Sequence, residues 1–242
     1  MNMLNTLLFI ALPYAATAFF VVGCVWRFRS AGYKVSSLSS QFLEGNKLFF
    51  GSTAFHWGIV VVFFGHLTAF LFPRETLAWN SQPVRLLILE ITGFAFGVSC
   101  LVGLISLFLR RLIHERIRVV TTPMDYFIEA LLIVQILLGC WIAFGYRWGA
   151  SWFASDLSPY LWSLVKFNPQ INAVSAMPPV VQAHIAGAFV ILGMIPFTRL
   201  IHFLAVPLQY VWRPYQQVIW SWDRKTIRDA RGVWSKKRPK NN

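Results

Sequence analysis

The sequence predicts an all-α membrane protein: a bundle of five transmembrane helices, with the N-terminus outside and the C-terminus in the cytoplasm. Three observations lead to this fold class. Of the 242 residues, 57% are hydrophobic and only 13% are charged, whereas about a quarter of an average soluble domain is charged. Five apolar stretches reach the length of a membrane-spanning helix, which needs roughly 20 residues. The Lys and Arg residues are concentrated in alternate connections between these stretches.

The five predicted spans differ in the polar residues that they contain. The first has no charged residue, and Arg27 follows its apolar run rather than preceding it, which argues against a signal peptide. The second and the fifth contain histidines, whereas the third and the fourth each have a glutamate near the start. The fifth is longer than a span requires, so we expect it to tilt or its last turns to leave the bilayer. The spans lie at about 3–26, 48–72, 86–109, 126–146 and 180–212.

The distribution of basic residues orients these spans. Connections 27–47 and 110–125 carry four Lys or Arg residues each, and the tail together with Arg199 carries ten. The other two connections, 73–85 and 147–179, carry two each. Because basic residues are in excess on the cytoplasmic side of membrane proteins, this split of 18 against four predicts an outside N-terminus and a cytoplasmic C-terminus.

The net charge of +13 is explained by this topology. No nucleic-acid-binding motif interleaves the basic residues, so we predict no nucleic-acid partner. The charge instead divides the chain into two predicted parts, a five-helix transmembrane domain at 1–212 and a basic cytoplasmic tail at 213–242. We expect the tail to contact a partner subunit or anionic membrane lipid.

The three cysteines, Cys24, Cys100 and Cys140, argue against several kinds of metal site. They form no C-x-x-C pair, so the sequence does not support an iron–sulfur cluster or a zinc ribbon in this chain. The absence of C-x-x-C-H also excludes the usual motif for covalent haem attachment. We interpret the cysteines as small packing residues.

Four of the five histidines lie within the second and the fifth span, where ionisable residues are costly and are therefore candidates for function. Imidazole is a suitable ligand for iron, copper and zinc. For a single isolated histidine, the alternative is a neutral side chain that hydrogen-bonds a neighbour. The fifth histidine, His114, is in a basic loop, and we expect it to be a solvated surface residue.

The spacing of the four histidines predicts two pairs at two depths. His184 and His202 are 18 residues apart, five turns of an α-helix, so they point to the same side roughly 27 Å apart along the axis. His56 and His66 are ten residues apart, roughly 15 Å along the axis and about 80° short of three full turns. Because the two spans are antiparallel, His66 pairs with His184 at the outer depth and His56 with His202 at the inner depth.

Facing imidazoles at two depths predict two six-coordinate, non-covalent b-type haems. A mononuclear metal site would gather its ligands at one depth, and a proton relay would alternate carboxylates with the histidines. A flat macrocycle also needs small residues beside it, and four glycines on the same spans offer that room, with helix packing as the alternative for each. They are Gly58, Gly65, Gly187 and Gly193.

Short motifs around these histidines point to a known family. The second span contains Phe55-His56-Trp57-Gly58-Ile59 and Gly65-His66, and the fourth contains Gln135 and Gly139. The third connection contains Arg110-Arg111-Leu112, Arg118 and Thr121-Thr122. The fifth span contains Pro196-Phe197-Thr198-Arg199-Leu200-Ile201-His202, followed by Val206-Pro207. In these motifs, over roughly residues 10–217, the chain resembles the gamma subunit of respiratory nitrate reductases, a di-haem cytochrome b membrane anchor.

The resemblance implies a quinol-oxidising electron-transfer subunit in the cytoplasmic (inner) membrane of a prokaryote. Quinol would be oxidised near the outer side, and electrons would pass through two b haems to a cytoplasmic iron–sulfur subunit. Nitrate would react on a separate molybdenum-containing catalytic subunit. His66 and His184 would ligate the outer haem iron, and His56 and His202 the inner haem iron.

The resemblance also implies a quinol site at the outer ends of the second and third spans. Arg85 would bind quinol there, together with His66 and Gly65. The family is expected to have lysine at the position of Arg85 and glycine at that of Ala69. Glu90, at the outer end of the third span, is interpreted either as an acceptor of a quinol proton or as a neutral carboxyl at the interface.

Basic side chains mark the predicted inner edge of the haem domain. Arg111 and Arg199, with Arg110 beside them, are placed where haem propionates would require cations. The alternative is that they only anchor the chain on the positive inner side.

Three other functions remain open at this stage. The chain could be a di-haem b, quinone-linked anchor of another cytoplasmic oxidoreductase, one that handles sulfur compounds or heterodisulfides. It could be a haem-free assembly anchor whose histidines pack in a polar core. A small-solute transporter would usually show repeats or helices broken at mid-membrane, and here only Pro196 interrupts a span.

Overall fold

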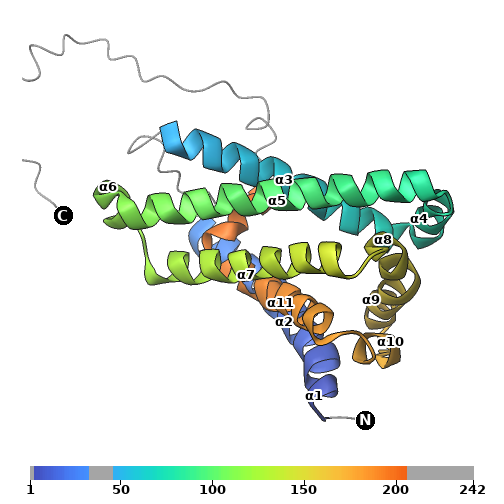
Figure 1. Ribbon diagram of the computed structural model, residues 1–242. Coiled ribbons are helices and arrows are strands. Elements are labelled where there is room, and N and C mark those ends of the chain that lie inside the picture. The colour runs from blue at the N-terminus through green and yellow to red at the C-terminus, as the bar shows by residue number, and fades with distance from the viewer. Residues whose placement is uncertain (1–2, 33–45, 206–242) are drawn as a thin grey trace, which may run out of the picture. The chain divides into compact units, whose positions relative to one another are not determined.

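The computed structural model describes residues 3–32 and 46–205, and in this part of the chain every regular element is a helix (Figure 1). Five helices are long and apolar enough to cross a membrane, which confirms the five predicted spans. They are Met3–Ser30, Leu48–Leu71, Pro83–Ile113, Pro123–Gly145 and Pro179–Phe197. The described residues belong to a unit that runs from Met1 to Pro207. The predicted tail at 213–242 and its boundary at 212 lie outside the described residues, and the orientation of the spans stays a prediction.

The spans are built from the following elements. The first is α1 (Met3–Thr6), a π-helical turn η1 (Leu7–Ala11) and α2 (Leu12–Ala31); the next three are α3 (Asn46–Leu71), α5 (Pro83–Ile113) and α7 (Pro123–Gly145); and the fifth begins with α11 (Pro179–Met194). Short helices occupy the connections: α4 (Pro73–Asn80), α6 (Glu115–Arg118), α8 (Gly149–Trp152), η3 (Phe153–Leu157), α9 (Ser158–Val165) and α10 (Asn172–Ser175).

Three of the long helices begin with proline in the first turn: Pro83 in α5, Pro123 in α7 and Pro179 in α11. A proline costs nothing there, because the first amides of a helix have no intrahelical acceptor. Helix α7 adds a capping box, in which the Thr122 hydroxyl accepts from the Asp125 amide (3.3 Å) and the Asp125 carboxylate accepts from the Thr122 amide (2.9 Å). The sequence thus marks where these spans start.

Helices α3 and α5 cross in close contact, and small residues make this possible (Figure 1). A Cβ atom added to Gly58 would lie 2.6 Å from the amide nitrogen of Cys100. Gly103 on α5 is similarly tight against Phe55 and Gly51 on α3. The two backbones approach each other where side chains are absent, as is common for helices packed in a membrane.

The fifth span is interrupted at Pro196, so the five regular α-helical turns expected between His184 and His202 are not formed. Helix α11 ends at Met194, and two 3-10 segments follow, η4 (Ile195–Phe197) and η5 (Arg199–Ala205), separated by an extended residue, Thr198 (φ −121°, ψ 178°). The physical cause is Pro196, which has no N–H to donate and whose ring clashes with the preceding turn. The remainder of the predicted span, 206–212, lies outside the described residues.

Helix α2 supports this break from the side. The Arg27 guanidinium donates a hydrogen bond to the carbonyl oxygen of Pro196 (2.9 Å). A Cβ atom on Gly23 would lie 2.7 Å from Cγ of Pro196, so only glycine fits beneath the proline ring. The first span therefore provides both the space and a hydrogen-bond donor for the point where the fifth span leaves α-helical geometry.

The connection from α8 to α10 packs as a small core against the start of the first span. Phe9, Tyr160 and Val174 are fully or almost fully buried in it. The Tyr160 hydroxyl donates to the Phe9 carbonyl (2.8 Å), and burial raises the pKa of this phenol above its usual value. Tyr160 thus remains a neutral donor at physiological pH.

The same connection also caps the end of α3. The Ser158 hydroxyl donates to the Ala69 carbonyl (2.9 Å), and the Trp162 indole N–H donates to the Phe70 carbonyl (2.9 Å). The last carbonyls of a helix have no intrahelical donor, so these two bonds fix the helix terminus one turn beyond His66.

Candidate functional site

The structure brings His56 and His202 together. His56 is on α3 and His202 is on η5, and their ring centroids are 6.1 Å apart with the ring planes at 66°. The pairing was expected from the spacing of the histidines. The expectation that five regular α-helical turns connect His184 to His202 was wrong. The break at Pro196 lies between the two histidines of the fifth span.

His66 and His184 form the second pair, at the other end of α3. His184 is on α11, and the two imidazoles are close enough to interact electrostatically. The His66 ring also contacts Phe153 of η3 in a T-shaped arrangement, with ring centroids 5.3 Å apart. The connection that caps α3 thus reaches the imidazole of this pair as well.

All four imidazoles have the same protonation pattern, because each Nδ1 atom lies within hydrogen-bond distance of a backbone carbonyl oxygen. A carbonyl oxygen can only accept, so Nδ1 carries the proton and Nε2 keeps the lone pair. The acceptors are the carbonyls of Ser52 for His56 (2.7 Å), Val62 for His66 (2.8 Å), Gln135 for His184 (3.1 Å) and Arg199 for His202 (2.7 Å). Histidines that bind a metal through Nε2 typically show this arrangement.

The environment of the pairs also suits a large bound group. His56 and His66 are exposed on the surface of the chain even though they lie within an apolar span. A polar ring that faces hydrocarbon at membrane depth is costly, so both positions favour a bound group that contacts the imidazoles. In the described part of the chain, no three His, Cys, Asp or Glu side chains gather around one point as a metal ion would require. The donor set is two imidazoles at each of two levels.

Of the four glycines expected to leave room, one faces open space. An added Cβ on Gly65 would meet nothing within 4 Å. The other three serve helix packing: Gly58 against α5, Gly193 against Ala16, and Gly187 against the side chain of Gln135. Gly65 immediately precedes His66, so the open space lies beside the second pair. With the lone pairs on Nε2, these features fit a planar iron porphyrin held by two imidazoles.

Arg111 and Arg199 lie in a cluster of charges at the start of α7, where Asp125 is in the first turn. Arg111 binds Glu129 through two nitrogens, at 3.0 and 2.6 Å. The Arg199 Nε atom lies 2.7 Å from the Asp125 carboxylate, and another of its nitrogens donates to the Val120 carbonyl (2.8 Å). Asp125 and Glu129 had no role in the sequence-based site, although their spacing of four residues places them on one face of α7.

The residues expected to bind quinol lie apart from that cluster. The guanidinium of Arg85, an exposed residue in the first turn of α5, sits 5.1 Å from the ring centroid of Trp79. Within residues 3–32 and 46–205, no hydrogen bond or ring contact joins Arg85 to His66. Glu90, five residues further along α5, has a buried carboxyl oxygen for which the described residues provide no hydrogen-bond partner.

His114 differs from its expected solvated state. It is half-buried at the C-terminus of α5, where its backbone amide donates to the Arg110 carbonyl (3.1 Å). Its Nε2 atom is buried without a hydrogen-bond partner in the described structure. The break after α5 turns this residue inward, which its basic sequence neighbours do not suggest.

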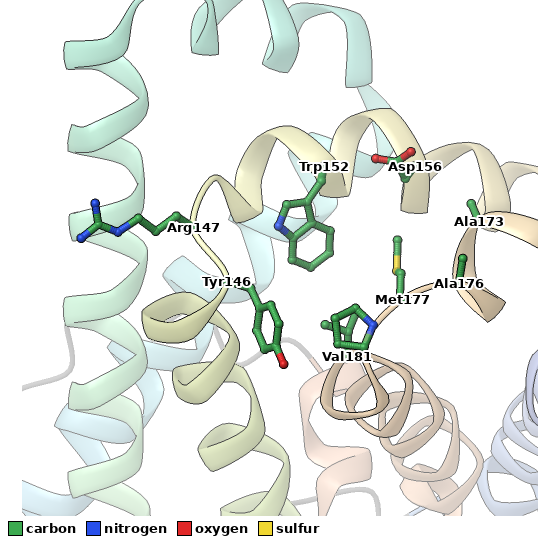
Figure 2. A pocket seen from close by; sticks show the side chains of 9 residues that line it. Tyr146, Arg147, Trp152, Asp156, Ala173, Ala176, Met177 and Val181 are labelled. Carbon is green, nitrogen blue, oxygen red and sulfur yellow. The ribbon is translucent and has the colours of Figure 1, made fainter.

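A cavity of about 600 Å³ lies between the ends of α7 and α11 and the α8–α10 connection. Figure 2 shows Tyr146, Trp152, Met177 and Val181 around it, whereas the side chain of Arg147 extends away from them. None of the four span histidines lines this cavity, so it is separate from both pairs.

Comparison with known proteins gives consistent matches over nearly the whole chain. A family model described as "Nitrate reductase gamma subunit" matches residues 5–221. The nitrate reductase gamma chain of Bacillus subtilis is 30% identical over 212 residues, which is 84% of this chain and 93% of the relative. The respiratory nitrate reductase 1 gamma chain of Escherichia coli is 32% identical over 221 residues, or 90% and 98% of the two chains. An Hdr-like menaquinol oxidoreductase cytochrome b-like subunit of Archaeoglobus fulgidus is 25% identical over 152 residues, 61% of this chain and 45% of that one.

Proposed function

The chain belongs to the nitrate reductase gamma subunit family, and from that premise we propose that it holds two b-type haems and delivers electrons from quinol to its partner subunits. Family membership and the five spans make it a multi-pass membrane subunit of a prokaryotic nitrate reductase, the membrane anchor of an oxidoreductase of nitrate respiration. The haems, their ligands, the quinol site and the direction of electron flow are the parts that we propose.

The observation that carries the proposal is the shared state of the four imidazoles. In each one Nδ1 donates to a backbone carbonyl, so each offers Nε2, and the histidines come from α3 on one side and from α11 and η5 on the other. We assign His56 and His202 to one haem iron and His66 and His184 to the other. A bound haem b exchanges one electron at its iron, so two of them would give the chain a path along its spans.

The residues of the chain then have separable tasks. The carbonyl acceptors fix each imidazole in the tautomer that ligates iron and restrict its rotation. Gly65 leaves the space that a macrocycle edge needs beside His66. Arg111 and Arg199 stand on the side of the His56–His202 pair, where they would attract haem propionates in competition with Asp125 and Glu129.

We place quinol oxidation at the His66 end of α3, with Arg85, His66 and Gly65 in contact with the quinol. Oxidation of one quinol to quinone releases two electrons and two protons, so the site must pass on the electrons and release the protons. Stacking on Trp79 holds the Arg85 guanidinium near the start of α5, where it is accessible to a headgroup. Glu90 is an ionisable group on the same helix with an oxygen free to take a proton.

Orientation follows from the charge distribution of the sequence. We place the N-terminus and the His66 end outside and the C-terminus inside, because 18 of the 22 basic residues belong to the connections on that side. Electrons would leave at the inner side to an iron–sulfur subunit, with the molybdenum-containing catalytic subunit beyond it. Protons released outside would make the reaction charge-separating.

A second candidate, a quinone-linked anchor of a different oxidoreductase, is supported by the Archaeoglobus relative alone. The name of this relative describes a menaquinol oxidoreductase cytochrome b-like subunit, and the match covers 61% of this chain. The haem and quinol assignments would be the same in both cases, and only the partner would differ. Identification of the subunits that co-purify with the tagged chain decides between them.

The proposal is tested by the optical spectrum and haem content of the purified complex. We expect a reduced b-type spectrum with two haems per chain, and quinol-dependent reduction of both. In His66→Ala, one haem should remain and quinol should no longer reduce it. A wild-type complex without haem would refute the cofactor assignment, and normal quinol oxidation by His66→Ala would refute the site of electron entry.

A further inference from the structure

His184 is held differently from the other three histidines. His56, His66 and His202 each donate to a carbonyl of their own helix, three or four residues earlier. His184 instead donates across to α7, to the Gln135 carbonyl (3.1 Å). Its orientation therefore depends on a second helix, and any change in that helix can reach the imidazole directly.

Gln135 and His184 bind each other in both directions. While the His184 ring donates to the Gln135 backbone carbonyl, the Gln135 side-chain amide donates to the His184 backbone carbonyl (2.9 Å). Two hydrogen bonds with opposite direction between the same two residues fix the distance and rotation of α7 against α11 at this level. We refer to this pair of bonds as the Gln135–His184 clasp.

Two glycines make the clasp possible. On α7, a Cβ added to Gly139 would lie 3.1 Å from Cε1 of His184, closer than nearly all real contacts of this kind. On α11, a Cβ added to Gly187 would overlap the Oε1 atom of Gln135. The His184 ring thus passes over Gly139 of α7, and the Gln135 side chain passes over Gly187 of α11. Each glycine lies about one turn from the residue of its own helix that takes part in the clasp.

We propose that Gln135 and Gly139 are positioning residues that set the rotation of the His184 imidazole and thereby tune one of the two haem sites selectively. The inference rests on the proposed function, since it presupposes that His184 ligates iron. The missing side chain at Gly139 leaves room for the His184 ring to reach the Gln135 carbonyl. The Gln135 side-chain amide holds the His184 backbone through its hydrogen bond to the His184 carbonyl. The His56–His202 pair shares no residue with this clasp, so its site should not respond.

The direct test is Gly139→Ala in the intact complex, with Gly145→Ala as the matched control. Gly145 is on the same helix, and an added Cβ there meets only Trp141 of its own helix, at 3.4 Å. The readouts are haem content, the low-spin EPR signals of the oxidised complex and a redox titration. In Gly139→Ala we expect two haems per chain, with a shifted EPR signal and midpoint potential for one of them, whereas Gly145→Ala keeps the wild-type spectrum.

Gln135→Met provides an independent test, because methionine has a similar length but no amide to donate. We expect it to shift the same EPR signal as Gly139→Ala and to leave the other signal unchanged. Wild-type spectra in both variants would overturn the inference while leaving the haem assignment intact. Equal shifts of both signals would also overturn it, since they would indicate a general loosening of the bundle.

The outcomes separate this inference from the proposed function. If the wild-type complex contains no haem bound by His184, the proposed function fails and the clasp is only a packing feature. If haem is present and Gly139→Ala loses the haem of the His56–His202 pair instead, the assignment of the clasp to one site is wrong.

Discussion

The imidazole of His202 lies 6.1 Å from that of His56, centroid to centroid, although the two residues are on helices of different kinds. His56 is on α3, a regular α-helix of 26 residues, whereas His202 is on the 3-10 segment η5 after the break at Pro196. A 3-10 helix rises about 2 Å per residue and turns faster than an α-helix. The break therefore sets both the depth and the direction of His202.

Gly23 on α2 packs directly against the break in the fifth span. In Gly23→Ala, the new Cβ would lie 2.7 Å from Cγ of Pro196, so the proline segment must shift. Overpacking of this kind costs about 1–3 kcal/mol. We expect a lower thermal unfolding temperature of the purified complex and preferential loss of haem from the His56–His202 pair.

Gly32→Ala is the matched control for that variant, because a Cβ at Gly32 meets nothing within 4 Å. It should match the wild type in haem content and in unfolding temperature. Equal behaviour of the two variants would show that α2 does not support the break.

Asp125→Asn tests the cluster of charges at the start of α7. The substitution removes the charge that Arg199 contacts at 2.7 Å, in a site where the Asp125 side chain is only 6% exposed. Breaking a buried ion pair costs several kcal/mol, and partial exposure of the arginine reduces the expected loss to about 1–3 kcal/mol. Thermal unfolding of the complex measures this loss.

Glu75→Gln serves as the control for Asp125→Asn, since Glu75 is an exposed acid in the first turn of α4. Its effect should be within about 0.5 kcal/mol, as for most surface substitutions. If Asp125→Asn is as stable as Glu75→Gln, the ion pair between Asp125 and Arg199 contributes nothing to the stability of the fold.

The buried phenol of Tyr160 leads us to expect that the folded protein loses stability at alkaline pH. Burial raises its pKa in the folded state above the unfolded value of about 10. The phenol therefore contributes stability that is fully present below about pH 10 and is lost as the pH rises through the folded pKa. Unfolding temperatures measured from pH 8 to above pH 10 should fall more steeply for the wild type than for Tyr160→Phe.

At neutral pH, Tyr160→Phe loses the hydrogen bond to the Phe9 carbonyl, which lowers stability by about 1 kcal/mol. The two curves should converge as the pH rises. Parallel curves over the whole range would contradict the assignment of alkaline sensitivity to this phenol.

Much of this architecture is accessible from the sequence because it depends on local composition. Apolar length identifies the five spans, and the two antiparallel histidine spans place His56 near His202 and His66 near His184. The position of the prolines at the start of α5, α7 and α11 also follows from a local rule. These features need no knowledge of which helix packs on which.

The remaining features depend on contacts between distant segments. The hydrogen bond from Arg27 to Pro196 joins residues 169 apart in the chain, and the clasp between Gln135 and His184 joins residues 49 apart. Pro196 signalled an interruption of the fifth span, but the 3-10 geometry that follows depends on support from α2. Gln135 and Gly139 are part of the family-like motifs, yet only the packing of α7 on α11 shows what they contact.

Haem content in double variants is the most direct test of the paired histidines. His56→Ala with His202→Ala removes both ligands of one site, and His66→Ala with His184→Ala removes both ligands of the other, so each combination should leave one haem per chain. His56→Ala with His66→Ala takes one ligand from each site and should leave none. If His56→Ala with His184→Ala retained one haem while His56→Ala with His202→Ala retained none, the histidines would be paired crosswise and the account would be wrong.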